Sequence, residues 1–282
     1  WIPFYKSTID SKGNLLPNIY SKTQSDEFSI KLTDSLYLIS SYTDTIFNAI
    51  TKSELGAQKY VYSDLGFYLF PLMIKKLSGQ TIDEYCDEHI FKPMGMNSTG
   101  YLPLTRFDTV RIIPSEIDRE WRHDTILGYV NDQGCAMLGG ISGHAGLFSN
   151  STDLSKLCQM WLNGGIYGET EFFDKQTLET FTTAPFASSG NRRALGFDRP
   201  LKKYNINGPT CKYASQKSFG HTGFTGAFIW IDPEYDCFIY ADFFYLLTNR
   251  TFPSSKENRL ANLNIRTQIQ EIFYKAIIDN NQ

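Results

Sequence analysis

The spacing of apolar residues predicts two helices in the first half of the chain. Apolar side chains recur at helical spacing from residue 65 to residue 77, and Gly79 supplies a stop. Pro71 falls inside this run and predicts a kink in the helix. Thr81 and Glu84 have the spacing of a capping box, which predicts that a second helix begins there.

Further helices are predicted on both sides of this region. The first sixty residues are rich in turn signals and predict one short helix near residues 44–52. Polar residues 151–153, apolar positions at helical spacing up to 162, and Gly164-Gly165 after them predict another helix. The chain closes with an apolar stripe that predicts a helix packed on a sheet: Ile265, Ile269, Ile272, Phe273, Ala276 and Ile277.

From about Arg193 the pattern becomes typical of strands. Residues 224–231 and 237–247 are rich in β-formers, and residues 232–236 between them predict a hairpin with a longer loop. The predicted fold class is therefore α+β, with a mainly helical lobe over residues 1–192 and strands plus the final helix over residues 193–282. Glycine and proline do not cluster into a linker, so both parts are expected to form one module.

Composition and charge exclude several classes of function. The 282 residues carry a net charge of −3, so the chain has no excess of positive charge to attract a polyanion, and no nucleic-acid partner is expected. The longest apolar runs are far shorter than the roughly 20 residues of a membrane span. The five cysteines are scattered without a CxxC pair, which predicts neither a disulfide framework nor a metal site. No cofactor is predicted.

Two triplets, Tyr62-Ser63-Asp64 and His221-Thr222-Gly223, stand immediately before a predicted helix and a predicted strand. Side chains at such positions are exposed yet held by the element behind them. A tyrosine acts as a base only if nearby positive charge lowers its pKa well below about 10. His221 is a candidate for that cation or for binding a substrate carboxylate, and Gly223 lets a ligand approach the strand. Each triplet alone has a simpler interpretation, a buried phenol and a turn.

The case for catalysis rests on an ordered series of motifs that resembles the class C β-lactamase, DD-peptidase and esterase family. The triplets resemble the family's Tyr-Xaa-Asn and Lys/His-Xaa-Gly motifs. The full series is Tyr62–Gly66, Pro93–Met96, Gly139-Gly140, Gly143–Ser149, Asp153-Leu154 and His221–Gly226. Three further segments are similar to modules fused behind a family 3 glycoside hydrolase domain: 128–132, 191–198 and 249–253.

The resemblance implies a β-lactamase/transpeptidase-like fold and a serine hydrolase that works through an acyl-enzyme. Tyr62 would shuttle the proton of the nucleophilic serine, His221 and Thr222 would hold substrate, and the backbone amide of Phe224 would complete an oxyanion hole. Asp64 stands where many relatives carry an amide donor, and His221 replaces the lysine of most true β-lactamases. Both departures favour ester or peptide chemistry over β-lactam turnover.

The family mechanism also needs a Ser-Xaa-Xaa-Lys motif, and none of the 17 lysines has serine or threonine three residues before it. The resemblance places that motif upstream of Tyr62. We therefore expect a truncated, inactive fragment that lacks the N-terminal strands and the nucleophile helix. The alternatives are a non-catalytic accessory module of a larger cell-wall glycosidase and a partner chain that supplies the nucleophile.

The resemblance also gives expectations for the intact protein. It is expected in the periplasm or cell envelope, and it is expected to act on peptidoglycan-derived peptides, esters or amides. An upstream glycoside hydrolase domain is its expected covalent partner.

Overall fold

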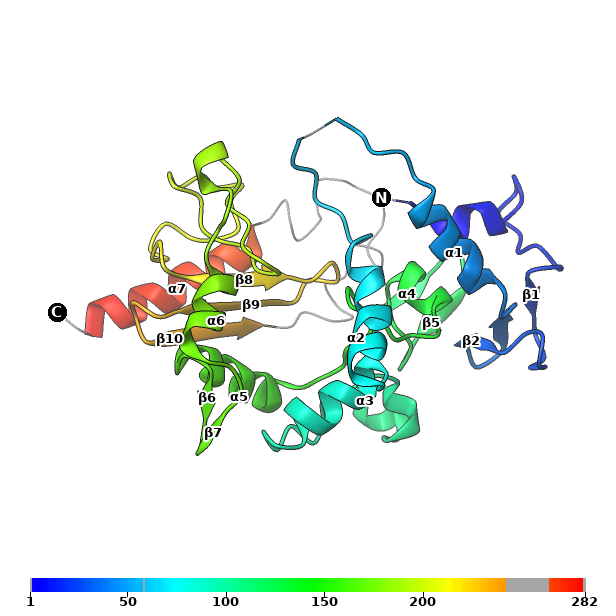
Figure 1. Cartoon of the computed structure of the whole chain (residues 1–282), viewed down its shortest axis with the longest axis horizontal. Helices are drawn as coiled ribbons and strands as arrows, with labels where there is room; N and C mark the ends of the chain where they lie inside the picture. The colour runs from blue at the N-terminus through cyan, green and yellow to red at the C-terminus, as the bar shows by residue number, and fades with distance from the viewer. Residues whose placement is uncertain (1, 58, 242–263, 281–282) are drawn as a thin grey trace. The chain divides into compact units, whose positions relative to one another are not determined.

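The computed structural model describes residues 2–57, 59–241 and 264–280, which fall into two units (Figure 1). Unit 1 contains Trp1–Pro93 and Ser98–Ser149, and unit 2 contains Met94–Asn97 and Asn150–Gln282. Helices and small antiparallel sheets occur together, which confirms the predicted α+β class. The predicted division of the chain between residues 192 and 193 stays a prediction.

Unit 1 begins with a small antiparallel sheet of order β1-β3-β2. Its strands are β1 (Tyr20–Ser21), β2 (Ile30–Thr33) and β3 (Leu36–Leu38). Sequence patterning did not reveal them because runs of two to four residues are too short to show a period. Helix α1 (Tyr42–Thr51) follows and confirms the short helix predicted near residues 44–52.

Helix α2 (Phe70–Ser78) follows a 3₁₀ turn at Phe67–Leu69. Gly79 ends α2 in the left-handed region, at φ +80°, and its N–H donates to the Lys75 carbonyl, as expected of a glycine stop. The predicted kink at Pro71 is wrong, because this proline lies in the first turn, where a helix needs no N–H from it. None of the residues of α2 is buried.

Helix α3 (Ile82–Cys86) begins with the capping box that the sequence predicts. The Thr81 N–H donates to Glu84 Oε2 at 2.9 Å, and the N–H of Glu84 is capped in return by the Thr81 side chain. A π-helical turn, Asp87–Phe91, continues the chain toward the Pro93 turn.

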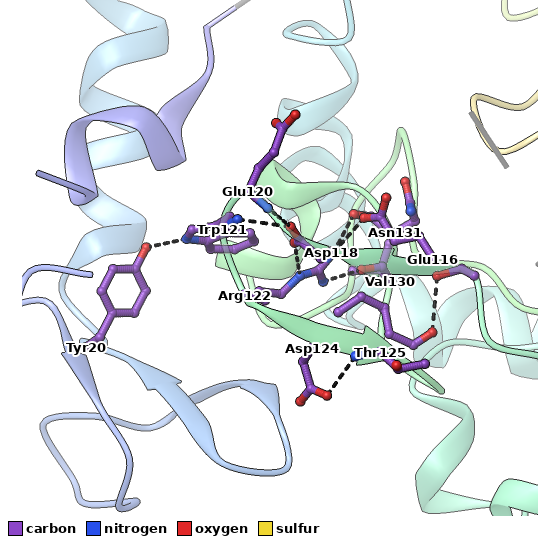
Figure 2. A network of polar contacts seen from close by, with 12 residues as sticks. Tyr20, Glu116, Asp118, Glu120, Trp121, Arg122, Asp124, Thr125, Val130 and Asn131 are labelled. Atoms are coloured by element: carbon purple, nitrogen blue, oxygen red, sulfur yellow. Dashed lines mark hydrogen bonds and ion pairs between the residues drawn. The ribbon is translucent and has the colours of Figure 1, made fainter. Parts of the chain in front are cut away.

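A buried charged network lies at a hairpin of two strands, β4 (Glu116–Asp118) and β5 (Asp124–Ile126), and connects β4 to the segment after β5, as Figure 2 shows. Arg122 lies in the connection, and its side chain is fully buried. Its Nε donates to Asp118 Oδ2 at 3.0 Å, and its Nη2 lies 3.4 Å from Glu116 Oε1. The guanidinium also donates to the carbonyls of residues 130 and 131, at 2.8 and 2.9 Å.

The same hairpin is tied to the first sheet through aromatic residues (Figure 2). Trp121 is fully buried, and its Nε1 donates to the Tyr20 hydroxyl at 2.8 Å. Burial raises the pKa of Tyr20 to about 12, against the opposing effect of its hydrogen bonds to Thr8 and Trp121. Arg122 therefore fixes the chain just before helix α4 (Gln133–Met137), while Trp121 anchors the hairpin to the core of unit 1.

Unit 2 contains a three-stranded antiparallel sheet of order β10-β9-β8. The strands are β8 (Phe219–Thr222), β9 (Phe228–Asp232) and β10 (Cys237–Ala241). Asp232 pairs with Cys237, which confirms the hairpin that residues 232–236 predict. The predicted start of its first strand at residue 224 is wrong, because residues 223–226 form a turn between β8 and β9. Residues 242–247 of the predicted second strand lie outside the described residues.

Helices cover both faces of this sheet (Figure 1). Helix α5 (Ser151–Leu162) begins at the cap Asn150, as the polar residues there predict, and packs Cys158 against Phe219 and Ile231. On the other face, Tyr274 of helix α7 (Ile265–Asn280) packs with Phe228, Trp230 and Ile239. The smaller elements of unit 2 are β6 (Ile166–Tyr167), β7 (Thr170–Glu171) and α6 (Lys175–Thr182).

The helix α7 is where the sequence places it, but its predicted packing stripe is confirmed only in part. Ile269 packs against the core cluster of Tyr274, whereas Ile272, Phe273 and Ala276 are exposed. The buried residues are Thr267, Gln270 and Tyr274, whereas Ile272 of the predicted stripe is 70% exposed. Gln270 Oε1 accepts from the Cys211 N–H at 3.0 Å. The Tyr274 hydroxyl donates to Asp232 Oδ2 at 2.6 Å. Hydrogen bonds thus set the register of this helix, and apolar spacing does not reveal them.

A bilayer-spanning helix is absent from the part of the chain that the structure describes, since no helix there is both long and apolar enough.

Candidate active site

Tyr62 lies in an irregular segment of unit 1, and its side chain is 52% exposed. The next two residues form a turn in which Ser63 Oγ accepts from the Leu65 N–H at 3.2 Å. The carbonyl of Asp64 accepts from the Phe67 N–H at 2.8 Å, which starts the 3₁₀ turn ahead of α2. The phenol of Tyr62 is therefore accessible and lies directly before this turn, and its catalytic role and that of Asp64 remain predictions.

A second polar cluster of unit 1 consists of Ser142, His144 and Asp132. Ser142 Oγ lies 2.9 Å from His144 Nδ1, and His144 Nε2 lies 2.9 Å from Asp132 Oδ1. The order resembles that of a Ser-His-Asp hydrolase. Ser142 is only 1% exposed, however, so a substrate carbonyl does not reach its hydroxyl. We assign the group a structural role.

That role is to join helix α4 to the 3₁₀ turn Phe67–Leu69, which follows the Tyr-Ser-Asp motif. Asp132 caps α4 by accepting from the Cys135 N–H at 2.8 Å. The His144 ring stacks on Tyr68, with ring centroids 4.1 Å apart. Burial alone would raise the pKa of Asp132, but the hydrogen bond and charge of His144 outweigh it and hold the pKa below its ordinary value.

In unit 2, His221 lies on β8 and is half-buried. Its Nδ1 lies 2.9 Å from the carbonyl oxygen of Thr222, and its Nε2 lies 3.0 Å from Nη1 of Arg193. The residue before it, Gly220, faces Trp230 across the strand pair, and a Cβ there would lie 2.5 Å from the indole ring. Only glycine fits this close approach of the two strands.

The loop before β8 carries two arginines that share one buried carboxylate. Asp198 pairs with the backbone of Gly220 in an isolated bridge, so this loop runs beside β8. Arg192 contacts the Asp198 carboxylate twice, with Nε 2.8 Å from Oδ1 and Nη2 2.9 Å from Oδ2. Arg193 lies farther away, with Nη2 3.4 Å from Oδ2.

The turn after β8 carries the backbone amide expected to complete an oxyanion hole. This amide belongs to Phe224, whose side chain is exposed. Within the turn, the N–H of Gly223 donates to the Ala227 carbonyl at 2.7 Å. Arg266 of α7 holds the turn from one side: Nε donates to the Gly226 carbonyl at 2.9 Å and Nη2 to the Gly223 carbonyl at 2.5 Å. This clamp restrains the orientation of the peptide units around Phe224.

The structure groups the predicted site residues by unit. Unit 1 holds Tyr62 and Asp64, and unit 2 holds His221, Thr222, Gly223 and Phe224. Sequence reasoning missed the contribution of Arg193 and Arg266. The only available signal for Arg193 was its place in a segment that resembles the family. Across residues 2–57, 59–241 and 264–280, no three His, Cys, Asp or Glu side chains gather as metal ligands.

Comparison with known proteins identifies the family. The family model described as Beta-lactamase matches residues 31–266. The chain therefore belongs to the β-lactamase family, as its motifs predict. Solved structures agree in fold: a β-lactamase from Mycobacterium bovis has a TM-score of 0.50 at 20% identity, covering 77% of this chain and 64% of that one. A mutant of simvastatin synthase from Aspergillus terreus has a TM-score of 0.56 at 15% identity, covering 86% and 62%.

Two curated relatives share more of the sequence. A protein of Escherichia coli (strain K12) named "Putative D-alanyl-D-alanine carboxypeptidase" is 35% identical over 188 residues, covering 62% of this chain and 42% of the relative. An N-acetylmuramyl-L-alanine amidase of Bacillus subtilis (strain 168) is 35% identical over 224 residues, covering 73% and 48%. The chain thus spans about half the length of these relatives or less.

Proposed function

We propose that the intact protein is a serine hydrolase that cleaves peptidoglycan-derived peptides, esters or amides through an acyl-enzyme. We further propose that its nucleophilic serine lies outside these 282 residues. The observation that carries the proposal is the family match over residues 31–266, which contain both triplets. The names of two relatives, a carboxypeptidase and an amidase, support a cell-wall amide as the substrate.

In the proposed reaction the serine hydroxyl attacks the substrate carbonyl and passes its proton to the phenolate of Tyr62. The backbone amide of Phe224 donates to the resulting oxyanion. Collapse of the tetrahedral intermediate breaks the bond to the amine or alcohol, which leaves with the proton from Tyr62. Water then hydrolyses the ester to the serine, with Tyr62 accepting a proton from the water and returning it to the serine oxygen.

The residues of the second triplet support ester or peptide chemistry over β-lactam turnover. His221 and Thr222 at the end of β8 are proposed to hold the substrate, and Gly223 lets it lie along the strand. Asp64, when ionised, accepts hydrogen bonds and cannot donate one to a substrate carbonyl as an asparagine amide does. We place the intact protein in the periplasm or cell envelope, where peptidoglycan is, with a glycoside hydrolase domain upstream.

A product assay with the full-length protein tests this proposal. We expect release of D-alanine from a peptide ending in D-Ala-D-Ala, or cleavage of the muramyl–L-alanine amide, and we expect a fluorophosphonate to abolish the activity. Turnover of the chromogenic β-lactam nitrocefin should be much slower than that of the preferred peptide or amide. Absence of fluorophosphonate-sensitive turnover with every one of these substrates would contradict the proposal.

The missing Ser-Xaa-Xaa-Lys motif favours one other candidate function, a non-catalytic accessory module. In that case the gene sequence upstream of residue 1 also lacks the motif, and the protein binds cell-wall fragments without cleaving them. Finding Ser-Xaa-Xaa-Lys upstream removes this candidate.

A further inference from the structure

Arg266 contacts both ends of the turn that joins β8 to β9. The turn runs from Gly223 to Gly226, and the Gly226 N–H donates to the Gly223 carbonyl at 3.3 Å. The two glycines leave the backbone here with wide conformational freedom. Arg266 restricts it, because its Nε donates to the Gly226 carbonyl at 2.9 Å and its Nη2 to the Gly223 carbonyl at 2.5 Å. One guanidinium thus holds the first and the last residue of the turn.

The contact with the Gly223 carbonyl determines the direction of the Phe224 N–H. Both groups belong to one peptide unit, which is planar and trans. In such a unit the C=O and the N–H point in opposite directions, so the Phe224 N–H points away from Arg266. A charged donor makes a stronger hydrogen bond than a neutral one, and hydrogen bonds in a chain polarise one another. The charge of Arg266 on the carbonyl therefore strengthens the N–H of the same unit as a donor.

Helix α7 holds Arg266 beside the turn through contacts farther along the helix. Gln270 and Tyr274 set the register of α7 by their hydrogen bonds to Cys211 and Asp232. Arg266 is the second residue of α7, and the first turn of the helix has no acidic residue. A cation at this place is opposed by the positive end of the helix dipole. The stability of the helix therefore does not account for an arginine here, whereas the contacts with the turn do.

We propose that Arg266 is a positioning residue for the reaction: it orients and polarises the peptide unit between Gly223 and Phe224, whose N–H stabilises the oxyanion. This inference rests on the proposed function and adds a residue that acts through the backbone. An oxyanion hole is effective because its donors are aligned before the negative charge develops. Holding the peptide unit in place beforehand removes its reorganisation from the reaction step.

Steady-state kinetics of the full-length protein with its preferred peptide or amide substrate test the role of Arg266. Arg266→Met keeps an unbranched side chain and removes both donors to the turn. We expect kcat to fall by about tenfold to a hundredfold while KM changes by less than about threefold, because the oxyanion forms only after the substrate is bound. The fall should be smaller than that for loss of an oxyanion donor itself, since the Phe224 N–H is still present.

Lys275→Met is the matched control in the same helix. Lys275 lies nine residues after Arg266, and its half-exposed side chain pairs with Glu271 at 3.0 Å. This spacing places it about 13 Å farther along the helix, so kcat should keep the wild-type value. Arg266→Lys keeps the positive charge but not the planar fork that reaches both carbonyls, so it should recover part of the lost kcat.

Infrared spectroscopy of the trapped acyl-enzyme separates positioning of the donor from a general loss of folding. A substrate with a ¹³C-labelled carbonyl identifies the stretch of the ester carbonyl that lies in the oxyanion hole. The stretch should move to a higher wavenumber in Arg266→Met, because a weaker hydrogen bond to the oxygen leaves the C=O bond stronger. Lys275→Met should leave the stretch at its wild-type position.

A wild-type kcat or an unshifted carbonyl stretch in Arg266→Met would overturn the assignment, as would an equal fall of kcat in Lys275→Met. If Arg266→Met does not fold, Arg266→Lys takes its place: a smaller fall of kcat and a smaller shift support the role, and wild-type values of both refute it. A full-length wild-type protein that forms no acyl-enzyme refutes the serine hydrolase and the assignment with it. A wild-type protein that acylates beside an unimpaired Arg266→Met refutes the assignment alone.

Discussion

Acylation of the full-length protein should slow by about a hundredfold to ten-thousandfold when Tyr62 is replaced by phenylalanine. The substitution removes the hydroxyl that is proposed to carry the proton between the serine, the leaving group and water. It keeps the aromatic ring, and the side chain is 52% exposed, so the stability of the fold should hardly change. The rate of covalent labelling by a fluorophosphonate measures the effect directly.

Tyr60 provides a matched control for this experiment. It lies two residues earlier in the same irregular segment and is 53% exposed, but the resemblance gives it no catalytic role. Tyr60→Phe should acylate at the wild-type rate. If Tyr62→Phe also acylates at the wild-type rate, Tyr62 is not the proton carrier.

Loss of the buried cation of unit 1 should have the largest effect on stability. Arg122→Met removes the guanidinium that contacts the buried carboxylates of Glu116 and Asp118, and it removes the donors to two backbone carbonyls. Breaking a buried ion pair from one side typically costs about 3–5 kcal/mol of the free energy of unfolding. Urea titration of the full-length protein at pH 7 measures this cost.

Arg119→Met is the matched control, since Arg119 is an exposed arginine in the same hairpin. Its effect on the free energy of unfolding should stay within about 0.5 kcal/mol. A cost of less than about 1 kcal/mol for Arg122→Met would contradict the role assigned to the network.

The cost of Arg122→Met should also depend on pH, in a direction that the Asp118 pKa determines. Burial alone would raise that pKa, but the charge of Arg122 and the hydrogen bonds to the carboxylate outweigh burial, so the pKa lies below its ordinary value. A carboxyl group with a lowered folded-state pKa stabilises the fold above its unfolded pKa of about 4, and loses this effect as pH falls through the folded value. The difference in stability between wild type and variant should therefore shrink below about pH 4.

Local signals predicted the elements whose ends depend on nearby residues. The capping box of Thr81 and Glu84, the stop at Gly79 and the polar start of α5 each act within a few residues of the helix end, and each prediction is confirmed. The packing of α7 depends instead on Gln270 and Tyr274 reaching residues 59 and 42 positions away. Apolar spacing says nothing about such long-range hydrogen bonds.

The candidate site shows the same limit. The two triplets could be identified because they are short and resemble known motifs. Arg193, which contacts His221, lies 28 residues earlier in the chain, and Arg266, which donates to the Gly223 carbonyl, lies 43 residues later. Only the folded chain brings these arginines to β8.

Covalent labelling by a fluorophosphonate, followed by peptide mapping, tests the central claim most directly. The full-length gene product should be labelled at a serine of a Ser-Xaa-Xaa-Lys motif upstream of Tyr62, while the 282-residue chain alone should remain unlabelled. A label on a serine within these 282 residues, or an unlabelled full-length protein, would contradict a serine hydrolase whose nucleophile lies outside this chain.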